Sequence, residues 1–272
     1  MTRQINKDTT LCMSLAARPS NFGTRFHNFL YEALNLDYIY KAFTTTDLAA
    51  AIGGVRALGI RGCAISMPFK EACIPMVDEL DPSAKAIDSV NTIVNTNGYL
   101  KAYNTDYIAI AKLLHEHQVP SNLVFALRGS GGMAKAVACA LKDAGFKKGY
   151  IIARNEDAGK QLAGLYGFDW APEMNGVQAD MLINVTPIGM AGGADAETLA
   201  FTESAIGAAQ VIFDVVAMPA ETPLIRYART QNKKVITGAE VFAIQAVEQF
   251  VLYTGIRPND EVFQQAAKHA RG

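Results

Sequence analysis

A lysine and an aspartate stand where this sequence could place acid–base chemistry. Lys70 follows the apolar run Gly62–Ser66 and the dipeptide Met67-Pro68, and Asp106 comes just before a helical pattern that begins at Ile108. A lysine can take a proton from a substrate if its pKa is lowered or its proton is passed on, and a nearby carboxylate can orient it. The alternative interpretations are an ordinary surface lysine and a simple helix N-cap.

A glycine-rich loop lies between a predicted strand and a predicted helix in residues 123–141, LVFALRGSGGMAKAVACAL. It has the G-x-G-x-x-A form of the dinucleotide fingerprint. Gly129 permits a tight turn, Gly131 lets the backbone approach a pyrophosphate, and Ala134 lets the helix pack against the strand. The helix N-terminus would favour the phosphate charge. We therefore predict a dinucleotide site, the alternative being a plain strand-to-helix turn.

The end of the next strand indicates which dinucleotide is bound. An NAD site would place Asp or Glu there to bind the ribose hydroxyls, whereas this strand ends in Arg154. An arginine can pair with a 2′-phosphate through charge-assisted hydrogen bonds, so NADP is preferred over NAD. Glu156 and Asp157 follow directly and could weaken that preference. The alternative is a solvated loop arginine.

The rest of the chain predicts the elements that hold these residues. Strand-like runs alternate with helical patterns, which is typical of the α/β class with parallel, doubly wound sheets. The predicted strands are residues 10–14, 38–43, 62–66, 92–95, 100–103, 123–127, 148–153, 181–184, 211–215 and 234–236. The predicted helices are residues 25–34, 46–58, 108–117, 134–144, 158–165, 224–231 and 241–252.

The pattern divides near residue 105, where cap-type residues start the helix that would join two domains. The first predicted domain comprises residues 1–105 plus 239–272, because the long apolar helix at Val241–Leu252 could cross back to it. The second, the dinucleotide-binding domain, comprises residues 106–238. Ligands of open α/β sheets lie at carboxyl strand ends, so a cleft between the two halves is expected.

Composition excludes several functional classes. The chain has 272 residues, half of them apolar, which suffices for one large or two medium domains. A net charge of −1 without a dense basic stripe argues against nucleic acid as a partner and gives no indication of a membrane surface. No apolar run approaches the roughly 20 residues that span a bilayer. The short run Leu11–Ala17 is interpreted as a strand and loop rather than a signal peptide.

Cysteines and histidines give no indication of a disulfide framework or a metal site. The cysteines lie far apart without a CxxC motif and are predicted to be core residues in a reducing cytoplasm: Cys12, Cys63, Cys73 and Cys139. His115 and His117 are two residues apart, so they would point to different faces of a helix. We interpret them as part of a solvated helix end.

Seven motifs together resemble the shikimate dehydrogenase family, most closely its divergent shikimate dehydrogenase-like branch. The resemblance covers nearly all of the chain, in the family's order and spacing. The motifs are Ser66–Glu71, Val90–Thr92, Asn104–Asp106, Gly129–Ala134, Asn184–Met190, Thr222–Leu224 and Gln245–Ala246.

This resemblance implies a cytoplasmic, two-domain oxidoreductase of aromatic amino acid biosynthesis. An N-terminal α/β substrate domain and a C-terminal Rossmann domain would use NADP(H) to interconvert shikimate, or a close hydroxy-acid analogue, and 3-dehydroshikimate. The enzyme would be a monomer or homodimer, without a metal and with weak shikimate activity. Lys70 and Asp106 match the catalytic pair, with Lys70 as the principal acid/base. The implied substrate ligands are Ser20, Asn21, Ser66, Asn91 and Gln245. The implied cofactor ligands are Gly129, Ser130, Gly131, Gly132, Met133, Arg154, Thr186, Met190 and Gly238.

Three departures from the family pattern leave the substrate open. The loop that binds the substrate carboxylate has Asn21 and Gly23 where the family has two serines, unless a one-residue shift lets Ser20 replace the first. Ala217 stands in place of a tyrosine and Ala158 in place of an arginine. The alternatives are a quinate or aminoshikimate dehydrogenase and a non-catalytic NADP-binding sensor. A folate-type dehydrogenase of similar plan has no support in the motifs.

Overall fold

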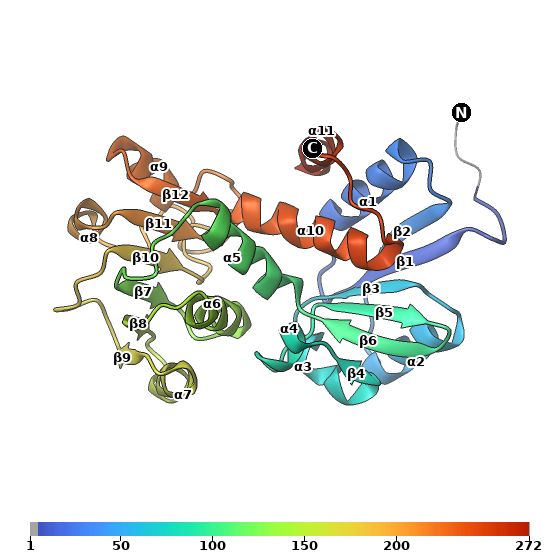
Figure 1. The fold of residues 1–272 in the computed structure, drawn as a ribbon, viewed down its shortest axis with the longest axis horizontal. Coiled ribbons are helices and arrows are strands. Elements are labelled where there is room, and N and C mark those ends of the chain that lie inside the picture. Colours follow the sequence, from blue (N-terminus) through green and yellow to red (C-terminus); the bar gives the residue numbers. More distant parts are fainter. Residues whose placement is uncertain (1–4, 272) are drawn as a thin grey trace. The chain divides into compact units, whose positions relative to one another are not determined.

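The computed structural model describes residues 5–271. The chain forms two compact units (Figure 1). One unit comprises the chain up to Thr105 together with the segment from Ala243 onward, and the other comprises Asp106–Phe242. Each unit contains one six-stranded sheet, and the predicted α/β class is confirmed. The second change of unit falls inside α10 (Gly238–Thr254), a few residues after the predicted boundary.

The sheet of the first unit is mixed. Its strands follow the order β2-β1-β3-β5-β6-β4, with bounds β1 (Thr10–Leu15), β2 (Tyr38–Phe43), β3 (Gly62–Ile65), β4 (Glu79–Leu80), β5 (Thr92–Thr96) and β6 (Tyr99–Tyr103). β1 runs parallel to β2 and β3, whereas β5 is antiparallel to both β3 and β6.

The prediction of a wholly parallel sheet is therefore wrong for this unit. β5 and β6 form a hairpin, because Asn97 and Gly98 both have positive φ, 54° and 88°. Two consecutive residues with positive φ, often Asn-Gly, make the two-residue turn that best matches the twist of paired strands.

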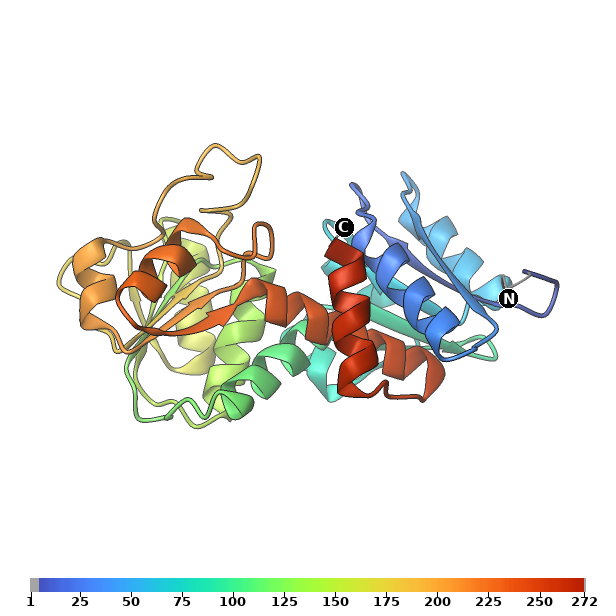
Figure 2. The same cartoon turned by 90° about the horizontal axis from the view of Figure 1, so that it is seen from above.

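Helices cover both faces of this sheet. They are α1 (Phe22–Ala33), α2 (Leu48–Ala57), α3 (Phe69–Ala72), the 3₁₀ turn η1 (Ile74–Met76), α4 (Pro82–Lys85), the end of α10 and α11 (Asp260–Arg271). Cys12 of β1 packs in a core with α1, α10 and α11, and the next residue, Met13, packs in a core with α2. Successive strand side chains point to opposite faces, so one strand serves both cores. Figure 2 shows α11 alongside α1.

The sheet of the second unit is parallel throughout, as predicted. Its order is β12-β11-β10-β7-β8-β9, with bounds β7 (Phe125–Arg128), β8 (Gly149–Ile152), β9 (Asp169–Ala171), β10 (Met181–Asn184), β11 (Val211–Asp214) and β12 (Lys234–Thr237). From β7 the chain adds β8 and β9 on one side and then β10, β11 and β12 on the other, so the strand order switches between β7 and β10. At such a switch point, the loops that follow the two strands diverge and leave room for a ligand.

Five helices complete the second unit: α5 (Thr105–Glu116), α6 (Gly132–Asp143), α7 (Glu156–Tyr166), α8 (Glu203–Ala208) and α9 (Pro223–Thr230). Ile206 of α8 and Leu224 of α9 pack with Ala126 and Leu182 on one face of the sheet. α6 lies on the other face (Figure 1).

Every predicted strand and helix is present, with its ends shifted by at most three residues. The prediction missed α3, η1, β4, α4, β9, α8 and α11. All four cysteines are buried and unpaired, which confirms them as core residues. No helix among residues 5–271 is both long enough and apolar enough to cross a membrane.

Candidate functional site

The glycine-rich loop has the geometry that a dinucleotide phosphate requires. Gly129 has φ of +126°, and a Cβ there would lie 2.7 Å from Cγ2 of Val185, so no other residue fits without a shift. Ala134 is fully buried, which lets α6 start close to the sheet. A Cβ at Gly131 or Gly132 would meet nothing within 4 Å, so the space above these residues is open.

The first turn of α6 suits an anion. Its N-cap residue is Gly131, which has no side chain to cap the helix. Backbone N–H groups at an uncapped helix start, together with the helix dipole, attract a phosphate group. Ser130 and Met133 flank this turn and are half-buried. These residues fit a pyrophosphate, and their binding role remains a prediction.

One of the two acidic residues after Arg154, Glu156, forms an ion pair within its own helix. Arg154 is exposed just beyond β8. Asn155 caps α7 by accepting a hydrogen bond from the backbone N–H of Ala158 at 3.1 Å. Glu156 pairs with Lys160 one turn along, at 2.6 Å. The negative charge of Glu156, which could repel a 2′-phosphate, is thereby partly neutralised.

Thr186 acts as a brace in the loop after β10. Its hydroxyl donates to Oδ1 of Asn184 at 2.6 Å and accepts from the backbone N–H of Ile188 at 3.3 Å. Met190, farther along, is exposed, and the N–H of Ala191 bonds to the carbonyl of Met218 at 2.9 Å. The loops after β10 and β11 are therefore tied together at the carboxyl edge of the sheet.

A buried carboxylate that sequence reasoning missed joins these loops. Asp214, at the end of β11, accepts hydrogen bonds from Thr222, Asn184 and the backbone N–H of Val216 at 2.7 to 3.0 Å. Burial raises its pKa to about 6, and these hydrogen bonds oppose the rise. An acid at the end of an apolar strand was the available signal.

Gly238 has a packing reason for its identity. A Cβ there would lie 2.3 Å from the carbonyl carbon and oxygen of Val216. The glycine lets the start of α10 lie against the backbone that follows β11. This packing role is separate from the predicted position of Gly238 near the nicotinamide, which stays a prediction.

Two predicted substrate segments meet at one edge of the first sheet. The loop after β1, which leads to Ser20 and Asn21, and the loop after β3, which begins at Ser66, leave the carboxyl ends of neighbouring parallel strands. The N–H of Ala17 bonds to the carbonyl of Met67 at 3.2 Å, so the loops are linked. Ser20, Asn21 and Ser66 are exposed there.

Lys70 lies on the short helix α3 at the same edge. The carbonyl of Lys70 accepts a hydrogen bond from the N–H of Val90 at 2.9 Å. Lys70 is half-buried. The Met67-Pro68 peptide that precedes α3 is cis. The backbone of Lys70 is thus held to the segment that enters β5.

Asn91 anchors the residue that precedes Asp106. β5 runs antiparallel to β3, so its start lies beside the end of β3, and the N–H of Ile65 bonds to the carbonyl of Asn91 at 2.7 Å. The buried amide of Asn91 accepts from the N–H of Thr105 at 2.8 Å and donates to the Thr105 hydroxyl at 3.0 Å. Asp106 follows in the first turn of α5 and is only 4% exposed.

Gln249 is a second functional candidate that sequence reasoning missed. Gln245, the predicted ligand, lies on α10 and is buried. Gln249, one turn along the same face, donates to the Thr92 hydroxyl at 3.0 Å and to the Asn91 carbonyl at 3.3 Å. Its spacing of four residues from Gln245 was the signal that could have found it.

The loop that contains Asn21 and Gly23 lies beside a buried tyrosine, Tyr40. Asn21 is the N-cap residue of α1, and its side chain makes no capping hydrogen bond. At Gly23, a Cβ would lie 3.4 Å from the hydroxyl of Tyr40. A tyrosine hydroxyl therefore stands next to the position where the family has a serine.

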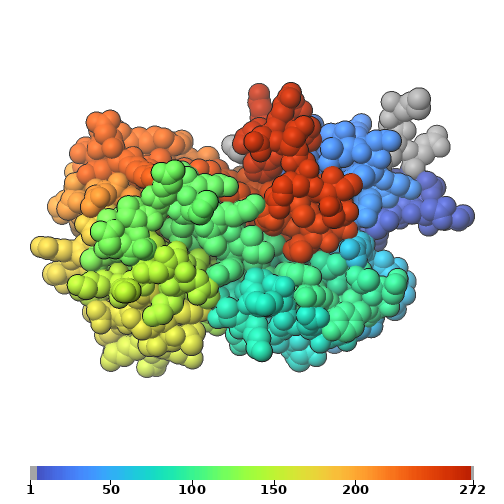
Figure 3. Space-filling model, in the orientation of Figure 1, coloured from blue at the N-terminus to red at the C-terminus, as the bar shows by residue number. Residues whose placement is uncertain are grey.

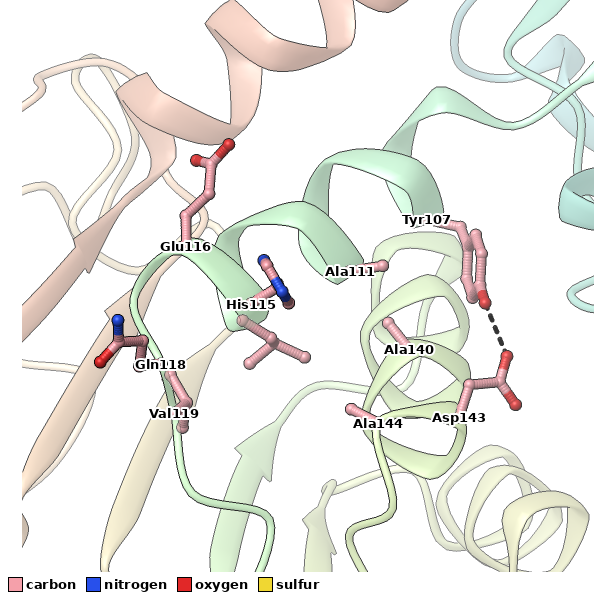
Figure 4. A pocket seen from close by; sticks show the side chains of 10 residues that line it. Tyr107, Ala111, His115, Glu116, Gln118, Val119, Ala140, Asp143 and Ala144 are labelled. Atoms are coloured by element: carbon pink, nitrogen blue, oxygen red, sulfur yellow. Dashed lines mark hydrogen bonds between the residues drawn. The ribbon is translucent and has the colours of Figure 1, made fainter.

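An open hollow of about 810 Å³ lies elsewhere in the second unit, between α5 and α6 (Figure 4). Tyr107 donates to Asp143 at 2.7 Å across its rim. The lining from α6 is its C-terminal end, so the hollow faces the edge of the sheet opposite the glycine-rich loop. None of the predicted site residues lines it. α5 and α6 form neighbouring green and yellow-green surfaces in Figure 3.

His115 and His117 lie in different environments. His115 is exposed, as expected at a helix end, whereas His117 is half-buried and its Nε2 lies 3.0 Å from Oε1 of Glu240. Within residues 5–271, no group of three or more His, Cys, Asp or Glu side chains is arranged to hold a metal ion.

Comparison with known proteins identifies relatives along the whole chain. A family model described as the shikimate dehydrogenase substrate binding domain matches residues 22–93. A shikimate dehydrogenase-like protein of Haemophilus influenzae is 60% identical over 267 residues, 98% of each chain. The NADP(+) shikimate dehydrogenase of Pyrococcus abyssi is 34% identical over 252 residues, covering 90% of this chain and 92% of that one.

Solved structures agree with these sequence relatives. A shikimate 5-dehydrogenase-like protein matches with a TM-score of 0.97 and 59% identity, covering 99% of this chain and 100% of that one. The Thermus thermophilus shikimate 5-dehydrogenase, solved in complex with NADP(H) and shikimate, matches with a TM-score of 0.85 and 27% identity, covering 96% and 99%.

Proposed function

We propose that this chain, which belongs to the shikimate dehydrogenase family, is an NADP-dependent oxidoreductase that interconverts shikimate, or a close analogue, and 3-dehydroshikimate. The observation that carries the proposal is the combination of a dinucleotide loop with a buried carboxylate, Asp106, at a helix start that Asn91 holds in place. A protein that only binds a nucleotide has no need of that carboxylate. We further propose that the chain is cytoplasmic, which the four unpaired cysteines support, and that it is a monomer or homodimer.

The residues of the second unit fit NADP. The start of α6 would hold the pyrophosphate through backbone N–H groups, and Arg154 would pair with the 2′-phosphate. When bound, the nicotinamide supplies a carbon that accepts or returns a hydride. The chain's own task is to bind and orient this group and to manage the proton.

Lys70 and Asp106 are proposed to manage that proton. As the alcohol is oxidised, its hydroxyl proton would pass to Nζ of Lys70, and the same proton would return in the reverse direction. The Asp106 carboxylate would orient the lysine. Asn91 would act mainly by positioning, because its amide is already bonded to Thr105.

A second candidate is a dehydrogenase for quinate or an aminated shikimate. The observation that favours it is that Asn21 and Gly23 stand where the resemblance places two serines, and that the Tyr40 hydroxyl beside Gly23 belongs to a buried residue. A changed set of donors at this point would weaken binding of the shikimate carboxylate and favour a different acid. Weak activity on shikimate itself is therefore expected.

A substrate screen tests the proposal. Shikimate, quinate and aminated analogues are each assayed with NADP⁺ and NAD⁺, by following absorbance of the reduced nicotinamide. We expect turnover with at least one of them and NADP⁺. Binding of NADP⁺ without turnover of any substrate would contradict the proposal and favour a non-catalytic sensor.

Variants at Lys70 test the chemical role. Lys70→Met and Lys70→Ala should reduce kcat by on the order of 100-fold or more, the range of general acid–base catalysis, while substrate binding is largely retained. Lys85, a lysine on α4, provides the matched control as Lys85→Met. Unchanged turnover in Lys70→Met would remove the lysine from the mechanism.

A further inference from the structure

Arg128 is an unusual residue to find at the end of a central strand. It is the last residue of β7 and comes directly before Gly129 of the dinucleotide loop. Its side chain is only 20% exposed. Its Nε atom is buried and has no hydrogen-bond partner among residues 5–271. A buried, unpaired donor on a charged group is costly, so something must normally compensate for it.

The protein compensates for the charge of Arg128 only in part. Glu173, just after β9, places Oε2 3.6 Å from a terminal nitrogen of the guanidinium, which is an ion pair but too long for a hydrogen bond. The guanidinium lies over the ring of Phe201, 5.2 Å from its centre. This ring contact orients the side chain and leaves Nε unpaired.

Arg154 brings a second positive charge close to Arg128. β7 and β8 are parallel neighbours in which Arg128 lies opposite Ile152. Arg154 comes two residues after Ile152, just beyond the end of β8, and its charge acts on the guanidinium of Arg128. Burial lowers the pKa of Arg128, Glu173 raises it, and the charge of Arg154 lowers it further.

Two arginines at adjacent strand ends favour a shared anion. We propose that Arg128 is a specificity-determining residue that binds the 2′-phosphate of NADP together with Arg154. The inference rests on the proposed function and deepens it. The pyrophosphate is provided for separately by the backbone at the start of α6, whereas the 2′-phosphate of a dinucleotide lies beyond the second strand, here β8. The family resemblance implies a second arginine at position 158, where this chain has alanine. Arg128 would supply the positive charge that Ala158 lacks.

Binding of two matched nucleotides by the full-length chain tests this inference. Adenosine 2′,5′-bisphosphate and adenosine 5′-monophosphate differ only in the 2′-phosphate, and both can be titrated by calorimetry at low salt. Arg128→Leu should weaken the bisphosphate about tenfold or more, as loss of charge-assisted hydrogen bonds predicts, and change the monophosphate less than about twofold. Arg128→Lys should lie between wild type and Arg128→Leu, because it keeps the charge without the fork.

A second variant acts in the opposite direction. Glu173→Gln removes the carboxylate that competes with the phosphate, so it should tighten the bisphosphate about two- to threefold, less at high salt. It keeps the inference testable if Arg128→Leu fails to fold in a thermal unfolding control. Arg226→Leu, an exposed arginine on α9, is the matched control and should change neither affinity.

The outcomes separate this inference from the proposed function. Equal weakening of both nucleotides in Arg128→Leu, or an unchanged affinity for the bisphosphate, would overturn the role of Arg128 alone. An unchanged bisphosphate affinity in Glu173→Gln would count against it too. Failure of the wild-type chain to bind NADP⁺ would instead overturn the proposed function, and this inference with it.

Discussion

The two predicted binding edges are held in different ways. In the second unit, the edge that would bind the cofactor is shaped by backbone, with Gly129 in a left-handed conformation and Gly131 and Gly132 open above the start of α6. In the first unit, the edge that would bind the substrate is shaped by side-chain hydrogen bonds: the buried Asn91 is bonded to Thr105, and the half-buried Gln249 is bonded to Thr92.

This difference indicates where the family can vary. An edge built from backbone tolerates changes at most positions but not at a glycine that no other residue can replace. An edge built from side-chain hydrogen bonds changes its chemistry whenever one donor is replaced. The departures at Asn21 and Gly23 fall in the first unit, and those at Ala158 and Ala217 fall in the second. We expect the departures in the first unit to change substrate choice.

The largest effect is expected at the backbone-built edge. Gly129→Ala places a Cβ 2.7 Å from Val185 in a left-handed conformation, so the loop must move. Because a misplacement of about 1 Å can cost on the order of 100-fold in rate, we expect a loss of that size in NADP⁺-dependent turnover. Gly164→Ala is the control, since a Cβ there meets nothing within 4 Å. Equal activity of the two variants would show that the loop geometry is unimportant.

At the substrate edge, a buried amide should dominate. Asn91→Ala leaves the N–H and hydroxyl of Thr105 without their partner. We expect a loss of about 3 to 4 kcal/mol in the free energy of unfolding, from lost hydrogen bonds and unsatisfied buried groups. Urea denaturation measures it. Kinetics should show kcat falling more than KM rises, because the start of α5 carries Asp106. A change confined to KM would favour direct substrate binding by Asn91.

The buried carboxylate of Asp214 should make the stability of the chain depend on pH. Its pKa is raised to about 6 in the folded chain, so the folded state holds a proton that the unfolded state releases from about pH 4. The stabilisation is therefore full below about pH 4 and is lost as pH rises through 6. Relative to Asp214→Asn, the wild-type chain should lose up to about 3 kcal/mol over this range.

Urea denaturation of the wild type and Asp214→Asn from pH 4 to pH 7 measures this difference. Asp157→Asn, an exposed acid on α7, serves as the control. A difference between wild type and Asp214→Asn that is constant across this range would contradict the raised pKa.

The smallest effect is expected at the acidic residue after Arg154. Glu156→Gln breaks an exposed pair with Lys160, and exposed pairs contribute about 0 to 1 kcal/mol. We expect the melting temperature to change little and NADP⁺ affinity to rise less than twofold. Lys160→Met breaks the same pair but leaves Glu156 unpaired near Arg154, so it should lower NADP⁺ affinity slightly. A large effect of Glu156→Gln would show that the acid contacts the cofactor.

Local sequence alone determined much of this protein. The strand–loop–helix around Gly129, the parallel sheet of the second unit and the burial of the four cysteines all follow from periodicity and from the steric demands of glycine, which act over a few residues. The Asn97-Gly98 hairpin was also encoded locally, although its turn signal was overlooked.

Tertiary structure decided the rest, because it depends on residues far apart in the chain. Asn91 is predicted from the sequence to bind substrate, and only packing adds that its amide is bonded to Thr105, fourteen residues away. The bond from Gln249 to Thr92 spans 157 residues. Burial of Asp214 and the proximity of the Arg128 and Arg154 charges likewise follow from strand order and register. Hydrogen-bond partners and desolvation are set by which strands become neighbours, and no local pattern specifies them.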